Sequence, residues 1–349
     1  MAVVGALAGC GSTNQAPADG GRDAHPGGSG GGVAGAGGGA GTSGASGGGG
    51  GAGTGGASGS GGAPACDGGA CQPTALAAAQ PSPCGLALDA ANVYWTTGAG
   101  TVVKAPIAGG DPTTLASGQD HPCGIAVDGA RVYWLNAASA GQVMTVPAAG
   151  GMPTKLADSL GMPWKLVIHD QTLYWTSQTA GTVSKVSEAG GDVTVLADIQ
   201  ATPVAIDADA QAVYWTSVGM SAIRFLSFAP GAVVQTLADE QETAVGLRVS
   251  AGFAYWTNDE SGTVSRAPVG GGAPVVLGTG PGAYGIAVDA SAVYWTDDVS
   301  GTVRRVAPSG GTPAILATGQ AQPTEIAVDA GNVYWLDAAS DGAVMKLAK

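Results

Sequence analysis

Histidine, cysteine and basic residues are scarce in this chain of 349 residues, which has 3 His, 5 Cys and 13 Lys plus Arg against 26 Asp plus Glu. At a formal net charge of −13, it offers no basic patch for nucleic acid or for an anionic membrane surface, so we expect no nucleic-acid partner. The absence of an apolar run long enough to span a bilayer excludes a transmembrane helix. With so few histidines and unsuitable cysteine spacing, we expect neither a metal nor a cofactor.

Glycine, by contrast, is abundant and unevenly spread. Between Gly27 and Gly62, 22 of 36 residues are glycine, and residues 11–65 are nearly all Gly, Ala, Ser and Thr. Such a segment has too little apolar surface to offset the entropy of ordering its backbone, so it is predicted to be a disordered tether. Residues 66–349 are enough for one core, and we expect a single monomeric domain there.

A repeated dipeptide organises this domain. Tyr-Trp occurs seven times at intervals of 39 to 41 residues, beginning at positions 94, 133, 174, 214, 255, 294 and 334. Around each copy stand four short apolar or alternating runs bounded by Gly, Asp, Ser or Pro, the pattern of four strands. Gly-Gly pairs, as at 109–110, suggest a two-residue hairpin, because glycine tolerates positive φ. Four antiparallel strands every 40 residues predict an all-β, seven-bladed β-propeller.

The two ends of the domain predict how the ring closes. The last unit stops at its third strand, residues 343–347, and lacks a fourth. Residues 73–77 (Pro-Thr-Ala-Leu-Ala) match the fourth strands of other units, as in Pro-Thr-Thr-Leu-Ala at 112–116. The N-terminal segment is therefore predicted to complete the last blade, which would also remove exposed sheet edges.

One unit carries a family resemblance. Residues 294–297 read Tyr-Trp-Thr-Asp, preceded by Ile-Ala-Val-Asp at 286–289 and followed by Gly-Thr-Val at 301–303. This YWTD unit resembles the class B repeat of the LDL receptor. The resemblance implies a propeller with a ligand-binding face that is often used for protein partners. The receptor domains have six blades whereas this chain has seven units, so no binding surface is transferred from them.

The N-terminus resembles a bacterial lipoprotein signal. Leu7, Ala8, Gly9 and Cys10 match a lipobox, which implies that Cys10 is lipidated after signal cleavage and that residues 1–10 are the signal. No Lys or Arg precedes the apolar run, although a secretory signal needs a basic segment there, so we expect the true start to lie upstream. Gly11, in place of Asp, resembles lipoproteins sorted to the outer membrane. We therefore expect a location in the cell envelope, held by the lipid anchor alone.

The repeated polar and aromatic residues are interpreted as structural. The Tyr-Trp pairs are expected to fill the wedges between neighbouring sheets. An aspartate ends the first strand of five units, five residues before the Tyr, where it is expected to cap the turn; these are Asp89, Asp128, Asp209, Asp289 and Asp329.

Function is sought where the repeat is broken. Trp164 and Tyr284, the two aromatics of these types outside the pairs, share the register at the start of the innermost strand. At the next position, Lys165 and Glu325 interrupt a ring of small residues, and His121 lies in the preceding loop. These five residues are predicted to form a ligand-facing rim at the mouth of the central channel. The alternative is that the two aromatics only plug the channel.

The remaining cysteines suggest disulfides. Cys66 and Cys71 bracket a tight loop, which suggests a local disulfide. Cys84 and Cys123 share the register of Trp164 in neighbouring units, so they are predicted to link the first two blades, provided their Cα atoms lie within about 7 Å. Asp207 and Arg248 likewise share a register, which suggests an inter-blade ion pair.

No catalytic motif is present, and no nucleophile elbow is found. The leading interpretation is therefore a non-catalytic binding or scaffold propeller for a protein or carbohydrate ligand. Two alternatives stay open: a lactonase- or lyase-like propeller enzyme, and a lipoprotein of envelope assembly.

Overall fold

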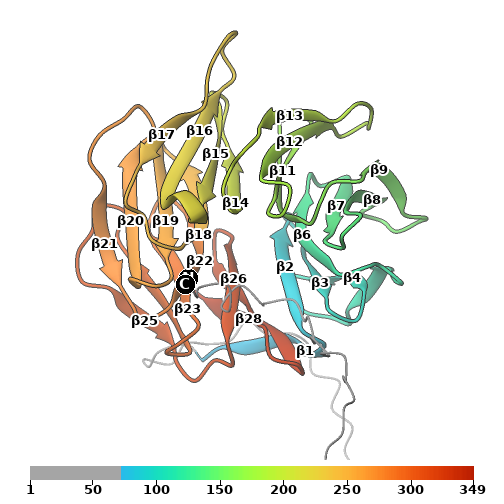
Figure 1. Cartoon of the computed structure of the whole chain (residues 1–349). Coiled ribbons are helices and arrows are strands. Elements are labelled where there is room, and N and C mark those ends of the chain that lie inside the picture. The colour runs from blue at the N-terminus through green and yellow to red at the C-terminus, as the bar shows by residue number, and fades with distance from the viewer. Residues whose placement is uncertain (1–71) are drawn as a thin grey trace, which may run out of the picture. The chain divides into compact units, whose positions relative to one another are not determined.

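A computed structural model describes residues 72–349, which form seven sheets of four antiparallel strands arranged in a ring (Figure 1). The prediction of an all-β, seven-bladed propeller is confirmed. Apart from the short 3-10 helix η1 (Val218–Met220), the described part of the chain contains no helix. The lipobox with Cys10, the glycine-rich tether, and Cys66 and Cys71 lie outside the described residues.

Each blade runs from an innermost strand at the axis to an outermost strand at the rim. The innermost strands are β2 (Pro83–Leu88), β6 (Pro122–Val127), β10 (Pro163–His169), β14 (Pro203–Ala208), β18 (Ala244–Ser250), β22 (Ala283–Val288) and β26 (Pro323–Val328). The second strands, which carry the Tyr-Trp pairs, are β3 (Asn92–Thr97), β7 (Arg131–Asn136), β11 (Thr172–Ser177), β15 (Ala212–Ser217), β19 (Phe253–Asn258), β23 (Val293–Asp297) and β27 (Asn332–Asp337).

The third strands are β4 (Thr101–Pro106), β8 (Gln142–Pro147), β12 (Thr182–Ser187), β16 (Ala222–Ser227), β20 (Thr263–Pro268), β24 (Thr302–Val306) and β28 (Gly342–Ala348). The outermost strands are β5 (Thr113–Ala116), β9 (Thr154–Asp158), β13 (Thr194–Ala197), β17 (Gln235–Ala238), β21 (Val275–Thr279), β25 (Ala314–Ala317) and β1 (Thr74–Gln80). We number the blades 1 to 7 from β2–β5 to the last blade, which contains β26–β28 and β1.

Blade 7 is assembled from both ends of the described chain. β1 pairs antiparallel with β28, with Thr74 opposite Lys346 and Ala75 opposite Met345. The blue strand β1 therefore lies beside the red strand β28 in Figure 1. The prediction that residues 73–77 supply the missing strand is confirmed, and the pairing covers the edge that β28 would otherwise expose.

The core consists of seven wedges, one between each pair of neighbouring blades. All seven tryptophans of the repeat are completely buried. Each packs in the same apolar cluster as the tyrosine of the preceding blade, as Trp134 does with Tyr94. The pair that closes the ring, Trp95 with Tyr334, follows the same rule. The structural interpretation of the Tyr-Trp pairs is therefore confirmed.

Polar contacts fix these buried rings. In Asp329, one carboxylate oxygen accepts the backbone N–H groups of Gly331 and Asn332, so the residue caps the turn as predicted. The other oxygen accepts the hydroxyl of Tyr334 at 2.7 Å, a contact that sequence reasoning missed. The same tyrosine–aspartate bond forms in four other blades, from Tyr94, Tyr133, Tyr214 and Tyr294.

A second contact that the sequence analysis missed holds the tryptophans. In five blades the indole Nε1 donates to a glutamine fifteen residues earlier, as Trp256 does to Gln241 at 2.7 Å. Leu160 and Gly280 occupy this position in blades 3 and 6. The indole N–H groups of Trp175 and Trp295 are correspondingly left without a partner within residues 72–349.

The glycine pairs do not form two-residue hairpins, so that prediction is wrong. Between β4 and β5 the connection spans the six residues 107–112. Gly109 and Gly110 nevertheless have φ of 95° and 139°, which explains why glycine recurs there.

Candidate functional site

The innermost strands surround an axial channel with a cavity volume of about 360 Å³. Its wall is mostly aliphatic, and Lys165, Asp207, Arg248, Tyr284 and Glu325 are its polar or aromatic exceptions. The channel is narrow because neighbouring innermost strands approach closely. A Cβ placed on Gly124 would lie 2.6 Å from the carbonyl oxygen of Trp164 in the next blade. This contact explains why small residues recur around the ring.

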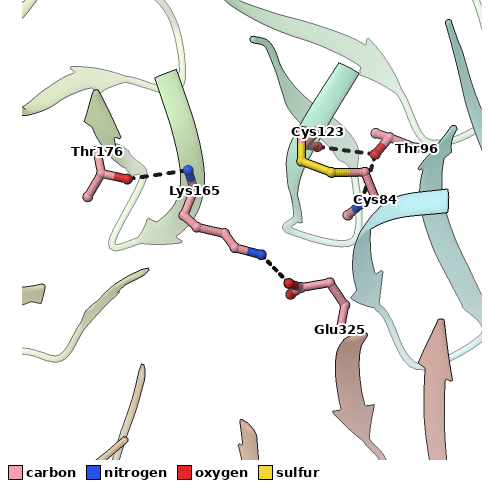
Figure 2. The surroundings of a disulfide bond; sticks show 7 residues. Cys84, Thr96, Cys123, Lys165, Thr176 and Glu325 are labelled. Carbon is pink, nitrogen blue, oxygen red and sulfur yellow. Dashed lines mark hydrogen bonds and ion pairs between the residues drawn. A yellow bond between two sulfur atoms is a disulfide. The ribbon is translucent and has the colours of Figure 1, made fainter. Parts of the chain in front are cut away.

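An ion pair spans one mouth of the channel. Lys165 at the start of β10 and Glu325 at the start of β26 belong to blades 3 and 7, and their side chains meet across the mouth (Figure 2). The side chains are 18% and 17% exposed, so both charges are largely removed from water. Removing either partner would leave the other charge largely buried and uncompensated.

Two aromatic side chains pack beside the ion pair. Trp164 and Tyr284 share a small cavity with Lys165 and Glu325, with a volume of only about 10 Å³. Burial, followed by the negative charge of Glu325, raises the pKa of the Tyr284 phenol, so this hydroxyl remains protonated at neutral pH. The buried indole N–H of Trp164 has no hydrogen-bond partner within residues 72–349. The buried hydroxyl of Thr324, which lines the same cavity, also has no partner in this part of the chain, so the closely packed mouth holds two unpaired polar groups.

His121 stands apart from these four residues. Its side chain is 59% exposed and its Nδ1 lies 2.7 Å from a carboxylate oxygen of Asp120. It is not among the residues that line the small cavity, although Cys123, two positions later, is. The structure therefore brings together Trp164, Lys165, Tyr284 and Glu325, and places His121 on the exposed surface.

A disulfide ties blades 1 and 2 at the same mouth. Cys84 on β2 and Cys123 on β6 are bonded, with Cα atoms 5.3 Å apart, within the predicted limit (Figure 2). Thr96 joins the same two blades, because its hydroxyl oxygen accepts the N–H of Gly85 at 2.9 Å and its hydroxyl donates to the Cys123 carbonyl at 3.3 Å. Threonines at the equivalent place make the same bridge in blades 3, 5 and 6. In blade 4 the hydroxyl oxygen of Thr216 accepts the N–H of Ala205 within the blade.

The expected ion pair between Asp207 and Arg248 is not formed as a direct contact. One oxygen of Asp207 accepts the N–H of Val249 in the next blade at 2.7 Å, whereas Arg248 donates to the carbonyl of Leu247 at 2.9 Å. Burial raises the pKa of Asp207, and the nearby charge of Arg248 partly opposes this shift. The carboxylate therefore binds a backbone amide across the blade boundary, which a comparison of registers could not reveal.

Two features are absent from residues 72–349, a metal-binding cluster and a membrane-spanning helix. These residues contain no group of three or more His, Cys, Asp or Glu side chains arranged to hold a metal ion. No helix among them has the length and apolarity needed to cross a membrane.

Comparisons with known proteins establish the fold alone. No family model matches the chain, and neither does any curated protein. Among solved structures, a streptogramin B lyase is 14% identical with a TM-score of 0.68, covering 79% of this chain and 96% of its own.

Two further solved structures also match over 80% of this chain and over nearly their whole length. Catalytically inactive virginiamycin B lyase from Staphylococcus aureus, solved with quinupristin, is 14% identical with a TM-score of 0.69, covering 80% of this chain and 98% of its own. The WD40 propeller domain of Doa1 is 13% identical with a TM-score of 0.68, covering 80% and 97%. The propeller is thus shared with lyases and with a WD40 domain.

Proposed function

We propose that this chain is a non-catalytic binding or scaffold propeller whose ligand contacts the mouth formed by Trp164, Lys165, Tyr284 and Glu325. The observation that carries the proposal is the ion pair between Lys165 and Glu325 across the mouth. Two aromatic rings, those of Trp164 and Tyr284, line the same end of the channel beside this pair. Aromatic side chains beside a few charges are typical anchors for protein or carbohydrate ligands. The unpartnered indole N–H of Trp164 adds a donor for such a ligand.

The setting of this activity is part of the proposal. With Cys10 lipidated and residues 11–65 acting as a tether, the propeller would stand clear of a bacterial outer membrane. A role in envelope assembly would use the same mouth for a protein partner. The similarity to lyases concerns the fold alone, and the two histidines in residues 72–349 belong to different regions, with His121 near the mouth and His169 at the far end of β10.

Site-specific cross-linking tests the proposal. The photoreactive residue p-benzoylphenylalanine replaces Trp164 at the mouth in one full-length variant. In a control variant it replaces Ile315, which is 54% exposed on the outermost strand β25. After illumination of intact cells, we expect a defined cross-linked product from position 164 and none from position 315. Loss of that product in a Lys165→Met background would assign it to the mouth.

Two results would contradict the proposal. The first is equal cross-linking from positions 164 and 315, or no product from position 164. The second is catalysis: chemical conversion of quinupristin by the purified chain, detected by mass spectrometry, would move the protein to the lyase class.

A further inference from the structure

Blade 3 lacks the carboxylate that binds the repeated tyrosine in five other blades. His169, at the end of β10, stands where five other blades have the aspartate. The hydroxyl of Tyr174 therefore has no carboxylate as hydrogen-bond acceptor at this position. Tyr174 is only 5% exposed, and burial raises the pKa of its phenol, so the group is a protonated donor. Within residues 72–349, the imidazole of His169 makes no hydrogen bond or ion pair.

A lysine in the same blade has also lost its usual acceptor. Lys185 on β12 lies opposite Tyr174. Lysines at this position in blades 1 and 7, Lys104 and Lys346, donate to a carbonyl of the following blade at 2.6 and 2.7 Å. In the described part of the chain, the half-buried ammonium of Lys185 has no such partner.

The next blade differs at the connection that borders this lysine. The connection between β16 and β17 spans residues 228–234, which is seven residues, one more than the connection 107–112 in blade 1. Phe228 at its start stacks on Tyr174 with ring centroids 5.7 Å apart. Blades 3 and 4 are neighbours in the ring (Figure 1), and this altered connection borders the space between them.

A cavity of about 840 Å³ lies between these two blades. His169 and Lys185 supply its side-chain nitrogen groups, and Tyr174, Thr172 and Ser227 supply hydroxyl groups. Leu196, Leu226 and Phe228 supply apolar surface. Because β10 begins with Trp164 and Lys165 near the mouth and ends at His169, this cavity lies at the other end of that strand. It is therefore separate from the proposed mouth site.

We propose that this cavity binds a small organic monocarboxylate with an apolar body, whose carboxylate takes the place of the aspartate missing from blade 3. The carboxylate would accept hydrogen bonds from the Tyr174 hydroxyl and the His169 ring, and would pair with the Lys185 ammonium. The apolar body would lie against Phe228 and the two leucines, in a cavity of the size that small-molecule sites usually have. Asp170 also lines the cavity and disfavours ligands of higher negative charge.

The first test uses 4-phenylbutyrate and octanoate as probes, with the neutral 4-phenylbutanamide as control, in calorimetric titrations of the full chain. We expect at least one carboxylate to bind with a dissociation constant below about 1 mM, and the amide to bind about tenfold more weakly or worse. Equal binding of acid and amide, or no binding of either acid, would overturn the proposal.

Three variants locate the binding. His169→Asp restores the residue found in five of the other blades, so it is expected to keep the fold while its own carboxylate occupies the site, weakening binding by about tenfold to a hundredfold. Lys185→Met is expected to weaken it similarly. Lys104→Met removes the equivalent lysine of blade 1 and is expected to leave affinity unchanged. Unchanged affinity in a folded His169→Asp variant would overturn this proposal, independently of the cross-linking result at the mouth.

Discussion

At the scale of single residues, buried polar groups of the repeat are paired at fixed spacings along the chain. In five blades the tyrosine hydroxyl donates to an aspartate, and in five blades the indole N–H of the tryptophan donates to a glutamine. The capping role of the aspartates could be predicted, since carboxylates at strand ends accept turn amides. Their bond to tyrosine was missed, although the constant five-residue spacing was a usable signal, as was the glutamine fifteen residues before five of the tryptophans. Both bonds matter because an unpaired buried donor destabilises the fold.

These bonds predict a difference between two equivalent tyrosines. Tyr334→Phe removes a hydrogen bond to the charged Asp329, so we expect it to lower the free energy of unfolding by about 1.5–3 kcal/mol. Tyr174→Phe removes a hydroxyl that has no carboxylate partner and should cost less than about 1 kcal/mol. Urea denaturation of both variants provides the measurement. Equal losses would show that the aspartate bond contributes nothing specific.

At the scale of the strand, periodicity predicts the pairings within a blade but not contacts between distant blades. The Cys84–Cys123 link could be predicted because neighbouring blades share a register. The Lys165–Glu325 pair joins residues 160 positions apart and depends on the width of the channel, which no local pattern encodes. The blade 3 cavity was missed for a similar reason, since it is lined by residues of two blades, among them Lys185 of blade 3 and Phe228 of blade 4.

The strand β1 offers a prediction at this scale. A variant that begins at residue 82 lacks β1 and loses the buried Ala77, together with the glutamine that accepts the indole N–H of Trp95. It also exposes the edge of β28. We expect it to unfold about 10 °C below a variant that begins at residue 72 and to self-associate, because these losses amount to several kcal/mol.

A peptide of residues 72–82 should restore the stability of the shortened variant in trans, which calorimetry and light scattering can follow. Identical melting temperatures for the two variants, with no rescue by the peptide, would show that ring closure does not depend on β1.

At the scale of the whole molecule, eight aspartates of the ring have pKa values that depart from the usual one, and they form two groups of four. Hydrogen bonds from turn amides and neighbouring side chains outweigh the effect of burial and lower the pKa of Asp89, Asp128, Asp289 and Asp329. Burial dominates elsewhere and raises the pKa of Asp207, Asp259, Asp298 and Asp337. For Asp298 the pKa rises to about 6, through burial and then through the charges of Asp259 and Asp297.

The two groups have opposite effects on stability. An aspartate whose pKa is lowered by folding stabilises the fold at pH values above its pKa in the unfolded chain. This contribution is lost as the pH falls through its pKa in the folded protein. An aspartate whose pKa is raised by folding stabilises the fold at pH values below its pKa in the unfolded chain. This contribution is lost as the pH rises through its pKa in the folded protein. Since unfolded aspartates titrate near pH 4, we expect stability to rise up to about pH 4–5 and to decline by about pH 7.

Thermal unfolding between pH 3 and pH 8 at constant ionic strength tests this expectation. Because Asp298 is partly exposed, solvent screening limits its share of the decline to the order of 1 kcal/mol. Asp298→Asn, which mimics the protonated acid, should keep the rise below pH 4 and reduce the fall between about pH 4 and pH 7. Two results would show that the carboxylates with raised pKa do not govern the stability of the ring. One is a melting temperature that rises steadily to pH 7, and the other is an Asp298→Asn profile parallel to that of the wild type.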